Sequence, residues 1–181
     1  MERSRLVFSG SGGQGIITAS IILAKAAAIF DDKNAIQSQS YGAAARGGAT
    51  RSDVIIDDST IFFPKVTQPN ILICLTQESY NKFAPIIRPG GLLLVDSKYV
   101  DIEKKVDAKH ISLPMFDTVM EKIGKPIVFN ICMLGALIGI SEIIRPDSIL
   151  KVLETTIPPD FMDINKKALD IGLSMGEKQK Y

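Results

Sequence analysis

A glycine-rich segment close to the start of the chain constrains the fold more than any other feature. Residues 10–15 read Gly-Ser-Gly-Gly-Gln-Gly and follow a short apolar stretch, Arg5–Ser9, which predicts a strand. They precede Ile16–Phe30, an alanine-rich apolar stretch whose only charged residue is Lys25, which predicts a buried helix. A strand, a glycine turn and a helix in this order favour an α/β fold with a Rossmann-like first unit, and the free N–H groups of such a helix suit a phosphate. The candidate ligand-binding residues of this turn are Gly10, Gly12, Gly13, Gln14 and Gly15.

The rest of the chain continues the alternation of strands and helices. Further strands are predicted at Ala35–Gln39, Ile71–Leu75, Leu92–Val95 and His110–Leu113, with a hairpin formed by Arg51–Asp57 and Ser59–Phe63. Helices are predicted at Gln77–Ile87, Pro114–Ile123, Ile131–Ile144 with Asn130 as its cap, from Pro146 onward, and at Asp160–Met175. We therefore expect a three-layer α/β/α architecture with a mostly parallel sheet, one domain over residues 1–176 and a polar tail at 177–181.

Composition excludes several classes of protein. Lys and Arg number 21 against 20 Asp and Glu, so no electrostatic argument favours nucleic acid or an anionic membrane as a partner. The longest apolar run, Ile131–Ile140, is half of the ~20 residues that a membrane span needs, and Met1–Ser9 is too short and too charged for a signal peptide. Cys74 and Cys132 lie far apart, which argues against a disulfide framework, a structural zinc site or a cysteine-ligated cluster and favours a reduced, cytoplasmic setting.

The glycine turn matches the Gly-x-Gly-x-x-Gly pattern of dinucleotide-binding folds. That function also needs an acidic residue at the end of the second strand, ~20 residues further on, to bind a ribose. Here this strand ends in Gln37-Ser38-Gln39-Ser40, whereas Asp31 and Asp32 come too early. NAD or FAD binding is therefore disfavoured, and ATP hydrolysis also, because the lysine of a P-loop is missing. A turn that serves only close packing stays open as an alternative.

A second unusual segment, Gln39–Gly48, combines three glycines with one arginine. Arg46 and the nearby Arg51 can address a carboxylate or a phosphate, or an arginine can simply pair with an acid such as Asp53. Both alternatives stay open. Because this segment and the glycine turn each follow a strand, we expect them to meet at the carboxyl edge of the sheet, where ligands bind.

The sequence lacks an obvious set of catalytic groups. The one histidine, His110, falls on a predicted strand, and no nucleophile–base pair or metal-ligand cluster can be assembled. Gly135 and Gly139 stand one helical turn apart and allow close packing, either within the chain or against a partner. A site shared with other chains would account for the missing chemistry.

Four motifs together resemble one family. They are the strand followed by the glycine turn at 10–15, Gln-Ser-Tyr-Gly-x-x-x-Arg-Gly-Gly at 39–48, Pro-Gly-Gly with an apolar strand and Asp-Ser at 89–97, and Asn130 followed by an apolar helix containing Leu-Gly-Ala-Leu. In this order and spacing, from about Arg5 to Gly172, the chain resembles the gamma subunit of 2-oxoacid:ferredoxin oxidoreductases. One departure is Ala43-Ala44-Ala45, where many members carry a proline or an acid.

The resemblance implies an enzyme that is shared among subunits. The family decarboxylates a 2-oxoacid oxidatively with coenzyme A, which yields acyl-CoA, CO2 and reduced ferredoxin. Thiamine diphosphate is expected in alpha and beta subunits and iron–sulfur clusters in delta or beta subunits, while the gamma chain serves the coenzyme A side of the site and assembly. By the same resemblance Tyr41, Arg46 and Gly47 join the turn as cofactor-binding residues, and 2-oxoglutarate is the favoured substrate. Made alone, such a subunit is expected to be inactive and to self-associate, for example as a homodimer. The alternative is a free-standing nucleotide- or CoA-binding module without catalysis of its own.

Overall fold

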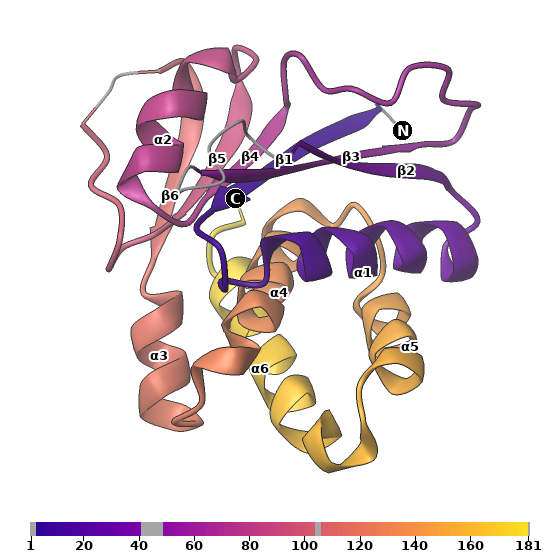
Figure 1. Ribbon diagram of the computed structural model, residues 1–181, viewed down its shortest axis with the longest axis vertical. Coiled ribbons are helices and arrows are strands. Elements are labelled where there is room, and N and C mark those ends of the chain that lie inside the picture. Colours follow the sequence, from indigo (N-terminus) through magenta and orange to yellow (C-terminus); the bar gives the residue numbers. More distant parts are fainter. Residues whose placement is uncertain (1–2, 41–48, 104–105, 181) are drawn as a thin grey trace.

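The sheet is mixed, with six strands in the order β2-β3-β1-β4-β5-β6 (Figure 1). The structure, a computed structural model, describes residues 3–40, 49–103 and 106–180. The strands are β1 Ser4–Gly10, β2 Asn34–Ser40, β3 Thr50–Asp57, β4 Ile71–Cys74, β5 Gly91–Asp96 and β6 Ala108–Leu113. Strands β1, β4, β5 and β6 pair in parallel, whereas β3 lies antiparallel between β1 and β2. The predicted α/β class with a mostly parallel sheet is thus confirmed, although β3 separates the two strands of the first unit.

The helices cover both faces of the sheet, as the α/β/α prediction requires (Figure 1). They are α1 Ile16–Phe30, α2 Gln77–Phe83, α3 Met115–Lys122, α4 Phe129–Ser141, α5 Pro146–Thr156 and α6 Pro159–Glu177, with single 3-10 turns η1 Ala84–Ile86 and η2 Pro126–Val128. Alternation along the strands divides the core: Leu6 and Phe8 of β1 pack under α1 and α4, whereas Val7 faces the α2 side. None of the described helices is long and apolar enough to cross a bilayer.

The hairpin predicted after β3 is wrong. The stretch Ser59–Phe63 forms no strand, and β3 pairs instead with β1 and β2, with Phe8 opposite Ser52 and Gln37 opposite Val54. The stretch does contribute apolar packing, because Ile61 contacts the core on the α2 side. The other residues of the stretch are exposed, Phe62 by 89% and Phe63 by 62%, so its β-forming composition corresponds to neither strand pairing nor burial in this chain.

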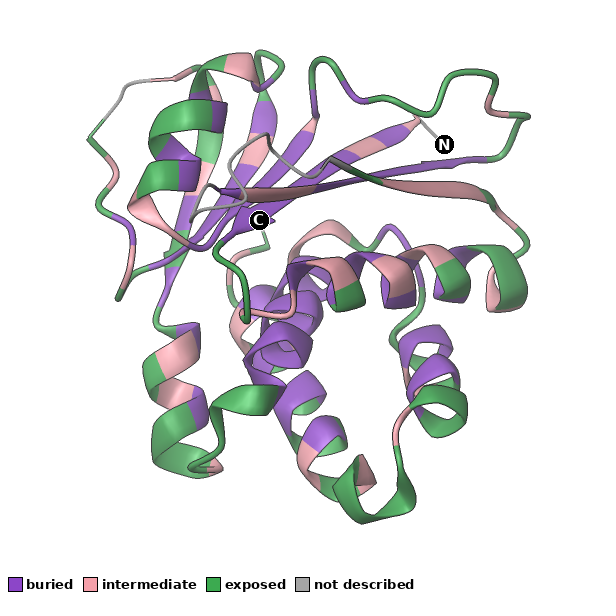
Figure 2. Ribbon diagram, in the orientation of Figure 1, coloured by how far each residue is buried: buried purple, intermediate pink, exposed green. Residues whose placement is uncertain are grey.

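The predicted cap and end of the apolar helix are also wrong. Helix α4 begins at Phe129, directly after η2, so Asn130 lies inside the helix and the cap position, Val128, offers no side-chain hydrogen bond. At its other end α4 stops at Ser141 rather than Ile144, because Glu142 adopts a left-handed backbone (φ 50°). Figure 2 shows α4 buried along nearly its whole length, which agrees with its uniformly apolar sequence.

Close packing of α4 on α6 settles the role of the paired glycines. A Cβ atom on Gly135 would lie 2.4 Å from the Leu169 carbonyl oxygen, and one on Gly139 would lie 2.6 Å from that of Leu173. The approach is reciprocal, since a Cβ on Gly172 of α6 would lie 2.0 Å from the carbonyl oxygen of Cys132. The glycines of both helices therefore serve packing within the chain, which is the first of the two alternatives that the sequence left open.

Candidate functional site

Three chain segments meet at one edge of the sheet. Gly10 at the end of β1 pairs with Thr50 at the start of β3, and Ser40 at the end of β2 pairs with Arg51. The glycine turn thus leaves the sheet at the same edge at which β2 ends with Ser40 and β3 begins with Thr50, on either side of residues 41–48. The candidates Tyr41, Arg46 and Gly47 lie outside the described residues, so their part in the site stays a prediction.

The glycine turn is held by the side chain of Gln14. Its Oε1 accepts a hydrogen bond from the Ser11 N–H at 2.8 Å, and its Nε2 donates to the Leu75 carbonyl oxygen at 3.1 Å, just beyond β4. A Cβ on Gly10 would lie 2.4 Å from Gln14 Oε1, so a larger residue there would displace the Gln14 side chain from its two hydrogen bonds. Gly10 and Gln14 shape the turn, whereas a Cβ on Gly12 or Gly13 would meet no atom of residues 3–40, 49–103 and 106–180 within 4 Å. The outer part of the turn therefore has room for a ligand.

Gly15 connects the turn to α1 and touches α4. Its backbone is left-handed (φ 73°), and a Cβ atom would lie 2.5 Å from Asn130 Nδ2. That nitrogen donates a long hydrogen bond of 3.4 Å to the Gly15 carbonyl oxygen. Among the described residues no side chain caps α1, and the first turn of the helix holds no acid. The N–H groups of the first turn are therefore available to an anion, which the partial positive charge of a helix N-terminus favours.

A cavity of about 430 Å³ opens beside the turn. Residues from the turn, η2, α4 and the α5–α6 corner line it: Gly13, Gln14, Gly15, Thr18, Pro126, Ile127, Val128, Asn130, Ile131, Ile157, Pro158, Phe161 and Asn165. Asn130 is buried, and its Oδ1 accepts no hydrogen bond from the part of the chain that the structure describes. The sequence reasoning missed this cavity because its walls come from segments more than a hundred residues apart, and no local pattern joins them.

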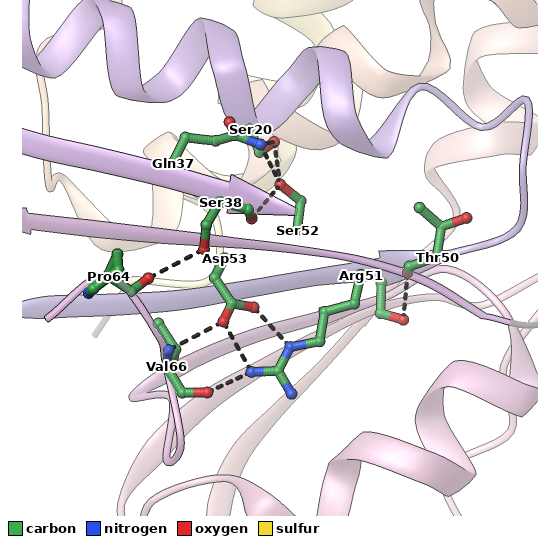
Figure 3. Close-up of polar contacts among 10 residues, drawn as sticks. Ser20, Gln37, Ser38, Thr50, Arg51, Ser52, Asp53, Pro64 and Val66 are labelled. Carbon is green, nitrogen blue, oxygen red and sulfur yellow. Dashed lines mark hydrogen bonds and ion pairs between the residues drawn. The ribbon is translucent and has the colours of Figure 1, made fainter. Parts of the chain in front are cut away.

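Arg51 belongs to the framework rather than to a ligand site (Figure 3). Its Nε and Nη2 donate to the two carboxylate oxygens of Asp53 at 2.7 and 3.0 Å, and it also donates to the Val66 carbonyl. The Val66 N–H completes the cluster by donating to Asp53 at 3.0 Å, and the guanidinium stands 5.3 Å from the centre of the Phe83 ring. Pairing with Asp53 is therefore the correct alternative for Arg51. The same hydrogen bonds hold the segment around Val66 against β3.

Near the end of β2 a dinucleotide-binding fold would carry an acid. Here the chain has Gln37, which belongs to a buried cluster of one amide and two hydroxyl groups. Gln37 Nε2 donates to Ser52 Oγ at 2.8 Å, and Ser52 Oγ lies 2.7 Å from Ser20 Oγ of α1 (Figure 3). These groups satisfy one another between α1 and the sheet. Because β3 also stands between β1 and β2, the arrangement that would place a ribose beside the turn is missing, which disfavours NAD further.

The described part of the chain holds no group of three or more His, Cys, Asp and Glu side chains that could bind a metal ion. Cys74 and Cys132 are free and buried, and burial raises the pKa of each thiol to about 12. Asp96 is fully buried, and burial raises its pKa even though it accepts N–H groups from Lys98 and Phe116. The hydrogen bond from Phe116 connects Asp96, at the end of β5, to the start of α3, so the role of Asp96 is structural.

Comparison with known proteins identifies the family. The pyruvate ferredoxin/flavodoxin oxidoreductase family matches residues 5–175. The chain belongs to this family. Among its relatives is the 2-oxoglutarate synthase subunit KorC of Methanocaldococcus jannaschii, 42% identical over 97% of this chain and 95% of the relative. The pyruvate synthase subunit PorC of Methanothermobacter marburgensis is 31% identical over 96% of each chain. The resemblance stated from the sequence motifs is therefore confirmed.

Two solved oxidoreductase structures share the fold of this chain. The gamma subunit of the keto/oxoacid ferredoxin oxidoreductase from Geobacter sulfurreducens is 36% identical, with a TM-score of 0.91 and full coverage of both chains. The 2-oxoglutarate:ferredoxin oxidoreductase of Magnetococcus marinus, determined with 2-oxoglutarate, coenzyme A and succinyl-CoA bound, is 19% identical. This chain matches 32% of its length at a TM-score of 0.87, which shows a shared fold. The chain is thus a gamma-type subunit of an oxidoreductase, and the alternative of a free-standing module is not favoured.

Proposed function

We propose that this chain is the gamma subunit of a 2-oxoglutarate:ferredoxin oxidoreductase. The observation that carries the proposal is the match to a 2-oxoglutarate synthase subunit over nearly the full length of both chains at 42% identity, above the 31% found with the pyruvate synthase subunit. The complex converts 2-oxoglutarate and coenzyme A to succinyl-CoA and CO2, and the released electrons reduce ferredoxin. Alpha, beta and delta subunits are its partners and hold thiamine diphosphate and the iron–sulfur clusters.

The contribution of this chain is a cradle for the phosphates of coenzyme A. Support comes from the uncapped N-terminus of α1 and from the open space beside Gly12 and Gly13, where a phosphate can approach the backbone N–H groups. Ser40 and Thr50, the described residues on either side of 41–48, lie at the same edge of the sheet as the glycine turn. By the family resemblance we assign Arg46 to the phosphates as a cation, and Tyr41 and Gly47 to coenzyme binding.

The KM for coenzyme A tests this cradle. Gly12→Val adds bulk where no atom lies within 4 Å, so the chain folds normally and the phosphates lose their approach to the backbone. We expect the KM for coenzyme A of the assembled complex to rise about tenfold in Gly12→Val and in Arg46→Ala, with little change in the KM for 2-oxoglutarate. Lys25→Ala, which removes an exposed cation further along α1, is the matched control.

Two results would contradict this assignment. Unchanged KM values for coenzyme A in both variants would remove the turn and Arg46 from the coenzyme site. Loss of assembly with no kinetic effect in the remaining complex would make them interface residues.

The substrate is tested separately, by comparing kcat/KM for 2-oxoglutarate, pyruvate and branched 2-oxoacids. Preference for another acid would overturn 2-oxoglutarate and leave the subunit assignment standing. We place the complex in the cytoplasm, a setting that suits the two free thiols.

A further inference from the structure

The cavity beside the glycine turn adjoins the place proposed for the phosphates of coenzyme A. Gly13, Gln14, Gly15 and Thr18, from the turn and the first turn of α1, form part of its wall. The rest of the wall comes from η2, α4, α6 and the residues before α6, and these helices pack on the same face of the sheet as α1 (Figure 1). A ligand whose phosphates lie at the turn therefore has about 430 Å³ of space directly beside them.

The wall of the cavity differs in chemistry from the helix N-terminus. None of the described residues that line it carries a charge, and most are aliphatic, aromatic or proline. A phosphate gains nothing from such a wall, because it would lose water without meeting a cation. Coenzyme A has two uncharged parts, the adenine base and the pantetheine arm, and either gains from leaving water at an apolar surface.

The reacting end of coenzyme A distinguishes these two parts. Coenzyme A reacts through the thiol at the end of its pantetheine arm. By the proposed function this thiol reacts at thiamine diphosphate, which other subunits hold, so the arm has to extend away from this chain. The adenine base takes no part in the reaction, and a single ribose joins it to the diphosphate. The base is therefore the part that suits a cavity within this subunit, directly beside the phosphates.

Asn130 of α4 supplies a hydrogen-bond acceptor in the cavity wall. It is 8% exposed, and its Oδ1 accepts no hydrogen bond from the described residues. The other atom of the amide faces the turn, because Nδ2 donates to the Gly15 carbonyl oxygen at 3.4 Å. A buried acceptor without a donor is unfavourable, so a ligand that brings an N–H group binds better than one that does not. The exocyclic amino group of adenine is such a donor.

We propose that the cavity holds the adenine base of coenzyme A and that Asn130 Oδ1 accepts a hydrogen bond from its exocyclic amino group. The inference rests on the proposed function, because it takes the ligand from the coenzyme site and adds the position of its base. Asn130 then has two tasks, since Nδ2 contacts the glycine turn that binds the phosphates and Oδ1 recognises the base.

The test measures binding of a nucleotide fragment to the assembled complex. Adenosine 3′,5′-bisphosphate carries the base, the ribose and two phosphates of coenzyme A without the arm. Titration calorimetry compares its Kd with that of the analogue in which hydrogen replaces the amino group. In the wild-type complex we expect the analogue to bind about fivefold more weakly, the value of one neutral hydrogen bond. In Asn130→Ala we expect the two Kd values to be equal, because the acceptor that distinguishes the two nucleotides is gone.

The ratio of the two Kd values separates recognition from a loss of structure. A general loosening of the turn in Asn130→Ala would weaken both nucleotides alike and leave their ratio at about five. Asn81→Ala is the matched control, because Asn81 is exposed on α2, which packs on the other face of the sheet, and it should keep the fivefold ratio. The comparison in the wild-type complex needs no variant, so it decides the matter even if Asn130→Ala assembles poorly.

Three results would overturn the inference. Equal Kd values in the wild-type complex would show that the amino group is not recognised. A fivefold ratio that persists in Asn130→Ala would assign its recognition to another residue. A raised KM for 4′-phosphopantetheine in Asn130→Ala, with unchanged nucleotide binding, would place the arm in the cavity. Failure of the proposed function is distinguishable, because Gly12→Val and Arg46→Ala would then leave the KM for coenzyme A unchanged, whereas failure of the base assignment alone leaves their effect in place.

Discussion

Alanine at Gly15 should destabilise the chain more than alanine at Gly13. Both glycines have left-handed backbones, with φ of 73° and 86°, so a side chain is strained at either position by about 1–2 kcal/mol. Only Gly15 faces a neighbour, because its Cβ would lie 2.5 Å from Asn130 Nδ2 and 2.8 Å from Asn130 Cβ. The Asn130 amide lies beside a cavity, but a change of side-chain rotamer does not move its Cβ atom, so that part of the contact cannot be relieved without a shift of α4. Overpacking of this kind costs a further ~1–3 kcal/mol.

The expected values follow from these two contributions. Gly13→Ala should lower the free energy of unfolding by about 1–2 kcal/mol and Gly15→Ala by about 2–5 kcal/mol. Asn130→Ala alone should cost about 1 kcal/mol or less, because it removes a 3.4 Å hydrogen bond together with an unpaired oxygen. In the double variant Gly15→Ala/Asn130→Ala the contact with Nδ2 is removed, but the contact with the Cβ atom of residue 130 at 2.8 Å remains. The two substitutions should therefore couple favourably, by about 1 kcal/mol rather than by the whole cost of overpacking.

Urea unfolding of the full chain measures all four variants, with unchanged m-values as the condition for comparison. Equal losses for Gly13→Ala and Gly15→Ala, or strictly additive effects in the double variant, would refute the contact between the glycine turn and α4. The ranking of the variants decides the matter, because absolute values depend on the extrapolation.

Three further predictions concern the framework. Gly172→Ala should lower stability by about 2 kcal/mol or more in thermal unfolding, because its Cβ would lie 2.0 Å from the Cys132 carbonyl oxygen and the ~1 kcal/mol gain in helix propensity cannot offset this; a variant as stable as wild type would contradict the packing. Cys74 and Cys132, with pKa values of about 12, should resist a colorimetric thiol reagent at neutral pH until denaturant is added, and rapid labelling of the native chain would refute their burial. Burial opposes ionisation of Asp31, but hydrogen bonds, two of them from Arg145, lower its pKa below 3.8, so it stabilises the fold above that pH and less so in acid. Asp31→Asn should therefore cost about 1–3 kcal/mol at neutral pH in urea unfolding, and a difference from wild type that did not shrink on acidification would contradict the sign.

Local sequence patterns predict those helices and strands that stand out as single apolar runs with clear limits in the sequence. The predicted bounds of Ile16–Phe30 are those of α1, because a polar turn and a glycine turn delimit one apolar run. Buried strands such as β4 were visible as continuous apolar runs. The glycine turn was recognised as a strand-to-helix connection, and it is one.

Long-range contacts explain the errors. Nothing local in Ser59–Phe63 distinguishes a strand from a largely exposed segment, and β3 pairs with β1 and β2, which are distant in the sequence. Asn130 looked like a cap because capping is a local pattern, whereas its actual neighbour, Gly15, is more than a hundred residues away. One missed signal was readable: Gly172 and Gly176 have the spacing of Gly135 and Gly139, and facing small-residue pairs predict a close helix crossing.

Purification of the tagged chain from its own cells under anaerobic conditions tests directly whether it is a subunit of this oxidoreductase. We expect recovery with a thiamine diphosphate subunit and other partners in fixed ratio, identified by mass spectrometry. The purified complex should reduce viologen with 2-oxoglutarate only when coenzyme A is present, and the chain produced alone should be inactive. A chain that is recovered alone, inactive with every 2-oxoacid yet able to bind coenzyme A or a nucleotide, would contradict the account.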